Sequence, residues 1–295
     1  MAEVRALSTG HSLLEGPRWR DGSLYVSDFF TRRVLKFDET GSYRTVCEVP
    51  GMPSGLGWTP DGRLLVVSMT DRALWRLDGD ELCQVADLSG VAAWHCNDMV
   101  VDQRGRAYIG NFGWDESTSS TIVPTSLIVV EPDGSVNSTA DDVVFPNGMV
   151  ITPDGGTLLI AETFSARITA FDISPDGRLF NRRLWASFSD EEFLTTTRAV
   201  EAGVCLPDGI ALDSDGCLWV ADANGSGVLR VREGGDVLQR IPIDENQTGY
   251  AVAMGGADLR TLFICAAAPY STVDVSTVHT SRLLSCRVDV AGVPA

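Results

Sequence analysis

The chain has 295 residues, of which 44% are hydrophobic, so it can bury one large core. Its formal net charge of −17 at pH 7 repels polyanions, and we therefore expect neither nucleic acid nor an anionic membrane surface as a partner. No apolar stretch approaches the length of a membrane span, and residues 1–11 lack the apolar region of a secretory leader.

A short pattern recurs six times along the chain, namely a polar residue, a short apolar run and then a tight turn. The pattern begins at Glu15, Ser54, Asn97, Asn147, Asp208 and, more weakly, Tyr250. Internal repetition of this kind indicates a closed array of equivalent units. In such an array the same position of every unit faces one axis, so these scattered residues can form one site.

Each opening segment is followed by a turn and by further strands. Asp-Gly turns at 21–22, 61–62, 154–155 and 215–216 are strong hairpin signals. The predicted second strands are 23–27, 63–68, 106–110, 157–162, 217–222 and 261–266, and the third strands are 33–38, 73–78, 126–132, 167–172, 227–232 and 281–289. Most units end in a shorter, more polar fourth strand, and no helical periodicity competes over a long window.

These units predict an all-β, six-bladed β-propeller, with four-stranded antiparallel blades around a central channel. No composition break divides the chain, so residues 1–295 are predicted to form a single domain. The last unit supplies only three strands, whereas residues 3–8 read as a spare strand before the first unit. We predict that this N-terminal strand is the outermost strand of the last blade and closes the ring.

In this topology the inner strands all start on one face of the ring, which brings four oxygen-bearing side chains to the axis. They are Glu15, Asn97, Asn147 and Asp208. Two crowded carboxylates need neutralisation, and a divalent cation supplies it. Oxygen ligands suit Ca²⁺ first, with Mg²⁺ and Mn²⁺ next and Zn²⁺ less well matched. The alternative is that Asn-Gly and Asp-Gly only form turns at the strand ends.

Four motifs resemble those of the regucalcin/gluconolactonase family of six-bladed propellers. They are Glu15-Gly-Pro-x-Trp19, Asn97-Asp98, Pro146-Asn-Gly-Met149 and Pro207-Asp-Gly-Ile-Ala211. The resemblance covers essentially the whole chain and implies a lactone hydrolase with one divalent cation. It also implies that Glu15, Asn147 and Asp208 hold the cation, that Asp208 serves as general base, and that Asn97 contacts substrate.

The chain departs from this family two residues before Asn97. Sugar-lactone members commonly carry an arginine there that binds substrate hydroxyls, whereas this chain has His95. A histidine beside the site could act as acid or base, because it titrates near neutral pH. The alternative is a hydrogen-bonding role in the channel wall. Asp115 is the nearest match to a second substrate-contacting acid of the family, and Trp114 beside it is predicted to line the same pocket.

The loops on this face are rich in aromatic residues, namely Phe29, Phe30, Phe112, Trp114, Phe164 and Tyr270. Together they indicate an apolar pocket and a substrate less polar than a sugar lactone. The alternative for any single ring is packing between blades.

The sequence therefore predicts a metal-dependent hydrolase that opens a lactone, with a small molecule as its substrate. One rival is a propeller that binds Ca²⁺ or a small ligand without turnover. Another is a different reaction on the same scaffold, such as phosphoester hydrolysis or an amine–aldehyde condensation. Seven cysteines without a C-x-x-C motif favour reduced thiols and a cytoplasmic location. The oligomeric state stays open.

Overall fold

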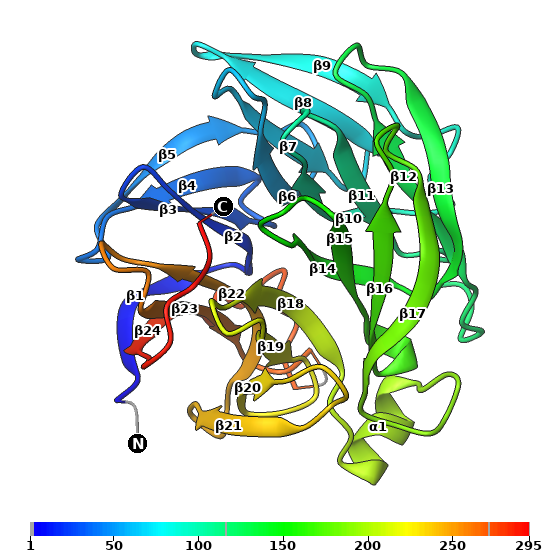
Figure 1. Cartoon of the computed structure of the whole chain (residues 1–295). Coiled ribbons are helices and arrows are strands. Elements are labelled where there is room, and N and C mark those ends of the chain that lie inside the picture. Colours follow the sequence, from blue (N-terminus) through cyan, green and yellow to red (C-terminus); the bar gives the residue numbers. More distant parts are fainter. Residues whose placement is uncertain (1–2, 116, 271, 295) are drawn as a thin grey trace.

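A computed structural model describes residues 3–115, 117–270 and 272–294, and its strands form six four-stranded antiparallel sheets. The sheets stand around a common axis, as Figure 1 shows, and this confirms the predicted propeller. The first five blades take their strands in chain order. They are β2 (Leu14–Arg20), β3 (Ser23–Asp28), β4 (Arg33–Phe37) and β5 (Tyr43–Glu48); β6 (Pro53–Trp58), β7 (Leu64–Ser68), β8 (Ala73–Asp78) and β9 (Glu81–Asp87); β10 (Cys96–Val101), β11 (Ala107–Asn111), β12 (Thr125–Val130) and β13 (Val136–Val143); β14 (Pro146–Ile151), β15 (Thr157–Glu162), β16 (Arg167–Ile173) and β17 (Leu179–Ser187); and β18 (Pro207–Leu212), β19 (Leu218–Asp222), β20 (Gly227–Val231) and β21 (Val237–Pro242).

The sixth blade joins the two ends of the described chain. It contains β22 (Thr248–Gly255), β23 (Thr261–Ala267) and β24 (Ser281–Arg287), and its outermost strand is β1 (Arg5–His11). Arg5 pairs with Ser285 across a sequence separation of 280 residues. The predicted closure by the N-terminal strand is therefore confirmed, and it covers an edge that would otherwise be open.

Every inner strand carries one extra residue relative to its partner. Glu15 pairs with Ser27, but Arg18 pairs with Tyr25, so three steps on β2 match two steps on β3. The other blades show the same irregularity at the equivalent place. A β-bulge re-aims side chains and bends the strand. The polar residues of the repeat therefore lie at or beside bulges, not in the tight turns.

Glycines next to these polar residues let neighbouring inner strands approach closely. A Cβ added at Gly148 would lie 2.6 Å from both the Asp208 carbonyl oxygen and the Ile210 nitrogen. The same construction at Gly55 would place a Cβ 2.3 Å from the Met99 nitrogen. The glycine of Asn-Gly and Asp-Gly is thus required by packing between blades.

Gly148→Ala is expected to lower the free energy of unfolding by about 1–3 kcal/mol, because the new methyl meets backbone that cannot rotate away. Urea-induced unfolding measures this change. Gly90→Ala is the matched control, since a methyl added there would meet no atom within 4 Å. Equal stability of the two variants would show that the inner strands separate without cost.

A polar residue ends the second strand of five blades, and in three of them its carboxylate ties down the chain that enters the inner strand. The Asp28 carboxylate accepts the Ser12 and Leu13 backbone N–H groups at 3.0 and 3.2 Å. Asp222 accepts from Leu206 at 3.1 Å, and Glu162 accepts from Val144 at 2.8 Å. Ser68 and Asn111 occupy the same place in the other two blades. These buried polar groups have structural partners and are not free for chemistry.

The structure adds two short elements that the sequence did not predict, the 3-10 helix η1 (Thr163–Ser165) after β15 and the helix α1 (Thr196–Ala202) between blades four and five. Thr195 caps the start of α1 by accepting the Arg198 N–H, and Gly203 ends it in the left-handed conformation. At seven residues it is too short to give a sustained helical period, which is why pattern analysis missed it. No described helix is long and apolar enough to cross a membrane.

Candidate functional site

Four predicted residues lie where the inner strands begin, and we call them the polar ring: Glu15 on β2, Asn97 on β10, Asn147 on β14 and Asp208 on β18. Asn97 Nδ2 donates to the Pro146 carbonyl at 3.2 Å, which joins blades three and four. Asn147 Nδ2 donates to Thr163 Oγ1 at 3.3 Å, and its side chain also hydrogen-bonds Asp208. These contacts fix the two amides beside the carboxylates.

The two carboxylates of the polar ring oppose each other's ionisation. Burial raises the pKa of Glu15 to about 8, and the nearby charge of Asp98 raises it further. The Gly16 N–H and Arg18 act in the opposite direction and lower this pKa. Burial also raises the pKa of Asp208 well above its usual value, with Glu15 and Asp98 as further causes. Asp208 Oδ1 is buried and has no hydrogen-bond partner. A positive charge beside these groups would remove both penalties.

The donor set fits a hard divalent cation. Among the described residues, no group of three or more His, Cys, Asp or Glu side chains is arranged to hold a metal ion. An ion here would also need an amide oxygen, and the Asn147 side chain, which donates an N–H to Asp208, carries one at the same place. The buried, unpartnered Asp208 Oδ1 is the atom that such an ion would satisfy. All-oxygen ligands of mixed charge are what Ca²⁺ and Mg²⁺ prefer.

Two charged residues near the ring were not predicted from the sequence. Arg18 Nη2 donates to Asp98 Oδ1 at 2.7 Å and to the Met99 carbonyl at 2.6 Å. Arg18 also follows the bulge of β2. The one signal in the sequence was Asp98 itself, which stands where the other acceptor motifs have glycine. Arg18 therefore neutralises the charge of Asp98, whereas Glu15 and Asp208 form no ion pair with any described basic side chain.

Tyr250 is the weakest of the six repeat starts, and the sequence assigned it no role at the site. It occupies the ring position of blade six on β22 and is buried. Its hydroxyl donates to the Ala268 carbonyl at 3.4 Å. Burial raises the pKa of Tyr250, and the charges of Asp208 and Glu15 raise it further. The hydroxyl therefore stays protonated beside the carboxylates.

The structure places His95 between two aromatic rings at the start of β10. Its ring lies 4.6 Å from that of Trp94 in a stacked arrangement and 5.9 Å from that of Phe112 edge-on, measured between centroids. Burial lowers the pKa of His95, against the raising effect of Asp115. The imidazole is therefore neutral at neutral pH and able to accept a proton.

Trp114 and Asp115 lie in the same loop but face different partners. The Trp114 ring packs 5.7 Å from Phe145 and 5.7 Å from Phe164. The Asp115 carboxylate accepts the Ser117 N–H at 3.0 Å and its hydroxyl at 2.6 Å. Asp115 therefore closes a local turn, and its described contacts do not reach the polar ring.

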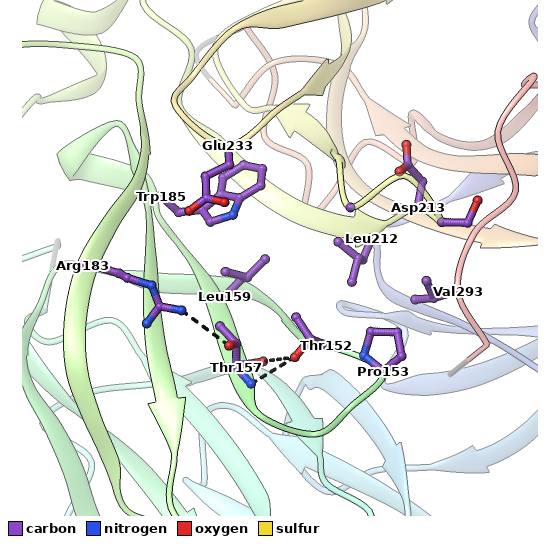
Figure 2. Close-up of a pocket in the computed structure, with 12 residues that line it drawn as sticks. Thr152, Pro153, Thr157, Leu159, Arg183, Trp185, Leu212, Asp213, Glu233 and Val293 are labelled. Carbon is purple, nitrogen blue, oxygen red and sulfur yellow. Dashed lines mark hydrogen bonds between the residues drawn. The ribbon is translucent and has the colours of Figure 1, made fainter.

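The four residues of the polar ring line neither of two cavities in the described part of the chain. One, of about 300 Å³, opens between blades four and five and is lined by Thr152, Trp185 and Val293 among others, as Figure 2 shows. The second, of about 490 Å³, is the far end of the central channel, between the last residues of the inner strands. Asp213 at the first cavity is already paired with Arg230 at 2.7 Å. We place the candidate site at the polar ring because the unpartnered buried carboxylate is there.

The fold and the ring define a six-bladed propeller with an oxygen-donor site where its inner strands begin. Residues 13–268 match the family described as the SMP-30/gluconolactonase/LRE-like region. The chain belongs to this family.

Named relatives give the family its chemistry. Pentonolactonase XacC of Haloferax volcanii is 27% identical over 272 residues, covering 90% of this chain and 86% of that protein. Regucalcin of Danio rerio is 26% identical over 290 residues, covering 94% and 90%. A solved gluconolactonase from Xanthomonas campestris is 27% identical with a TM-score of 0.74, covering 98% and 90%. Lactone hydrolysis is therefore supported at the level of the family.

Proposed function

We propose that this protein hydrolyses a lactone in a reaction that depends on a divalent cation. Glu15, Asn147 and Asp208 would hold the cation, with Ca²⁺ as the first choice and Mn²⁺, Mg²⁺ or Zn²⁺ as alternatives. The observation that carries the proposal is the buried Asp208 Oδ1, which has no partner and lies near a second carboxylate whose pKa is raised to about 8. Relatives named as lactonases supply the reaction class.

When bound, a divalent cation supplies Lewis acidity toward a carbonyl and toward water. The chain's own residues then position the substrate and take up the proton. Asn97, held by the Pro146 carbonyl, would orient the small-molecule substrate beside the carboxylates. Asp208 is our first choice as proton acceptor, and the neutral imidazole of His95 is the second. Trp114 and Asp115 would shape the approach to the ring.

The first test is acid release from a panel of lactones that spans sugar-acid, alkyl and aromatic rings. The protein is assayed after chelation and again after Ca²⁺, Mn²⁺, Mg²⁺ or Zn²⁺ is restored. We expect hydrolysis that disappears on chelation and returns with at least one cation. Cation-dependent thermal stabilisation without turnover of any lactone would instead identify a binding protein.

Without a cation, stability is expected to fall as the pH rises from about 5 to about 8. The pKa of Glu15 is about 8 in the folded chain against an ordinary 4.5, so the folded state binds the extra proton in this window. Raising the pH removes that proton and with it the stabilisation. Excess Ca²⁺ should flatten the dependence, because it replaces the proton. Thermal unfolding at several pH values, with chelator or with Ca²⁺, measures both, and identical curves would contradict the prediction.

A further inference from the structure

Six rings form a connected group that we call the aromatic wall: Trp94, His95, Phe112, Trp114, Phe145 and Phe164. Phe112 stacks on Phe145 at 4.5 Å between centroids, and Phe145 meets Phe164 edge-on at 4.9 Å. Trp114 packs against Phe145 and Phe164, while His95 links Phe112 to Trp94. Each of the six is only partly buried, so the wall keeps apolar surface open to solvent.

The aromatic wall is tied to the polar ring through the chain. His95 lies two residues before Asn97, and Phe145 lies two residues before Asn147. Phe164 follows Thr163, whose hydroxyl accepts from Asn147 and donates to the carbonyl of Pro207 at 2.8 Å. The wall therefore stands beside the ring over blades three and four.

A buried apolar cluster adjoins the wall on this face. Phe112 packs with a cluster that contains buried Leu13, Phe29, Met69 and Tyr250, contributed by blades one, two and six. The charged groups that neighbour His95 are Asp115 and Arg72. Asp115 is held by Ser117, and Arg72 Nη1 donates to the Ala92 carbonyl at 3.3 Å. A polyhydroxylated chain would meet hydrocarbon here where its hydroxyls need partners.

We propose that the substrate is a lactone that carries an aromatic ring fused or attached to it, and not a sugar lactone. This inference rests on the proposed function and names the substrate class for the same site. A flat ring would stack on the exposed edges and faces of the wall, as aromatic pairs do. It would cover half-exposed apolar surface while the lactone carbonyl reaches the polar ring.

The test compares two six-membered lactones with Ca²⁺-loaded protein. Dihydrocoumarin carries a fused aromatic ring, and glucono-δ-lactone carries hydroxyls. Each kcat/KM is divided by the spontaneous hydrolysis rate, and we expect dihydrocoumarin to be favoured by about a hundredfold or more. Trp114→Ala should lower kcat/KM for dihydrocoumarin by about tenfold more than it lowers kcat/KM for glucono-δ-lactone. Phe180→Ala, at an aromatic residue that is 52% exposed on β17, is the matched control and should change neither.

Binding of dihydroquinolinone, the lactam analogue that is not hydrolysed, separates this inference from the proposed function. Saturable binding that Trp114→Ala weakens, without hydrolysis of any lactone, would overturn the proposed function and support the aromatic site. Preference for glucono-δ-lactone would overturn the aromatic substrate class and leave lactone hydrolysis standing. Absence of both lactam binding and hydrolysis would overturn both.

Discussion

Asp208→Asn is expected to abolish cation binding and lactone hydrolysis together, lowering kcat by about a thousandfold or more. The substitution removes the charge that a cation would neutralise and keeps the size of the side chain. Without a cation the variant should be more stable than the natural chain, because Asp208 is buried and repelled by Glu15 and Asp98. With a cation in solution the order should reverse, since the natural protein gains about 2.7 kcal/mol at a hundredfold excess over Kd.

Thermal unfolding with and without Ca²⁺, together with calorimetric titration, measures these effects of Asp208→Asn. Asp215→Asn is the control from the same blade, because Asp215 is exposed and pairs with Arg230 at 2.9 Å. It should keep the full response to Ca²⁺. If Asp208→Asn still gains stability with Ca²⁺, the ion is held elsewhere and the polar ring is not the metal site.

Glu162→Ala is expected to be the most destabilising change outside the polar ring, costing about 3–5 kcal/mol. The Glu162 carboxylate is fully buried and accepts from Arg167 at 3.0 and 2.8 Å and from Arg182 at 3.1 Å. It also accepts the Val144 N–H and the Thr169 hydroxyl. Without this carboxylate, Arg167, Arg182 and the Val144 N–H each lose a hydrogen-bond acceptor. Urea-induced unfolding gives the loss directly.

Glu191→Ala is the control for this network, because Glu191 pairs with Arg198 on the surface and should shift stability by less than about 0.5 kcal/mol. A pH series adds a second check. Burial opposes ionisation of Glu162, yet Arg167 and Thr169 hold its pKa below the ordinary 4.5. The stability it provides is therefore present above that pH and is lost as the pH falls further. Glu162→Gln and the natural chain should converge in acid.

The repeat made the architecture predictable, since polar starts, Asp-Gly turns and alternating strands recur along the chain. The closing strand was predictable too, because the last unit was one strand short and a spare strand preceded the first. The helix at Thr196–Ala202 was not, because two turns leave no periodic signal. The need for glycine beside the ring residues could not be predicted either. It arises from the short distance between inner strands of neighbouring blades, which leaves no pattern in the sequence of one strand.

Within the site, the positions of the four polar-ring residues could be predicted from their equivalent places in the sequence repeat alone. Arg18 and Asp98 could not, because their pairing joins blades one and three across the channel, 80 residues apart in sequence. Phe145 and Trp94 were missed for a related reason. They lie just before inner strands and not in the loops after second strands, so only the folded ring shows that they continue the aromatic wall.

Closure by β1 also sets an order of events during synthesis. β1 is made before every other described strand, yet its partner β24 is made last. At about 5–20 residues per second, the 280 residues between Arg5 and Ser285 take roughly 14–56 s to translate. During that interval β1 has no partner strand. Its sequence Arg-Ala-Leu-Ser-Thr-Gly-His contains a single large apolar residue, which disfavours aggregation with other chains. The ring can therefore close only as a late, long-range step, after the strands between β1 and β24 have been synthesised.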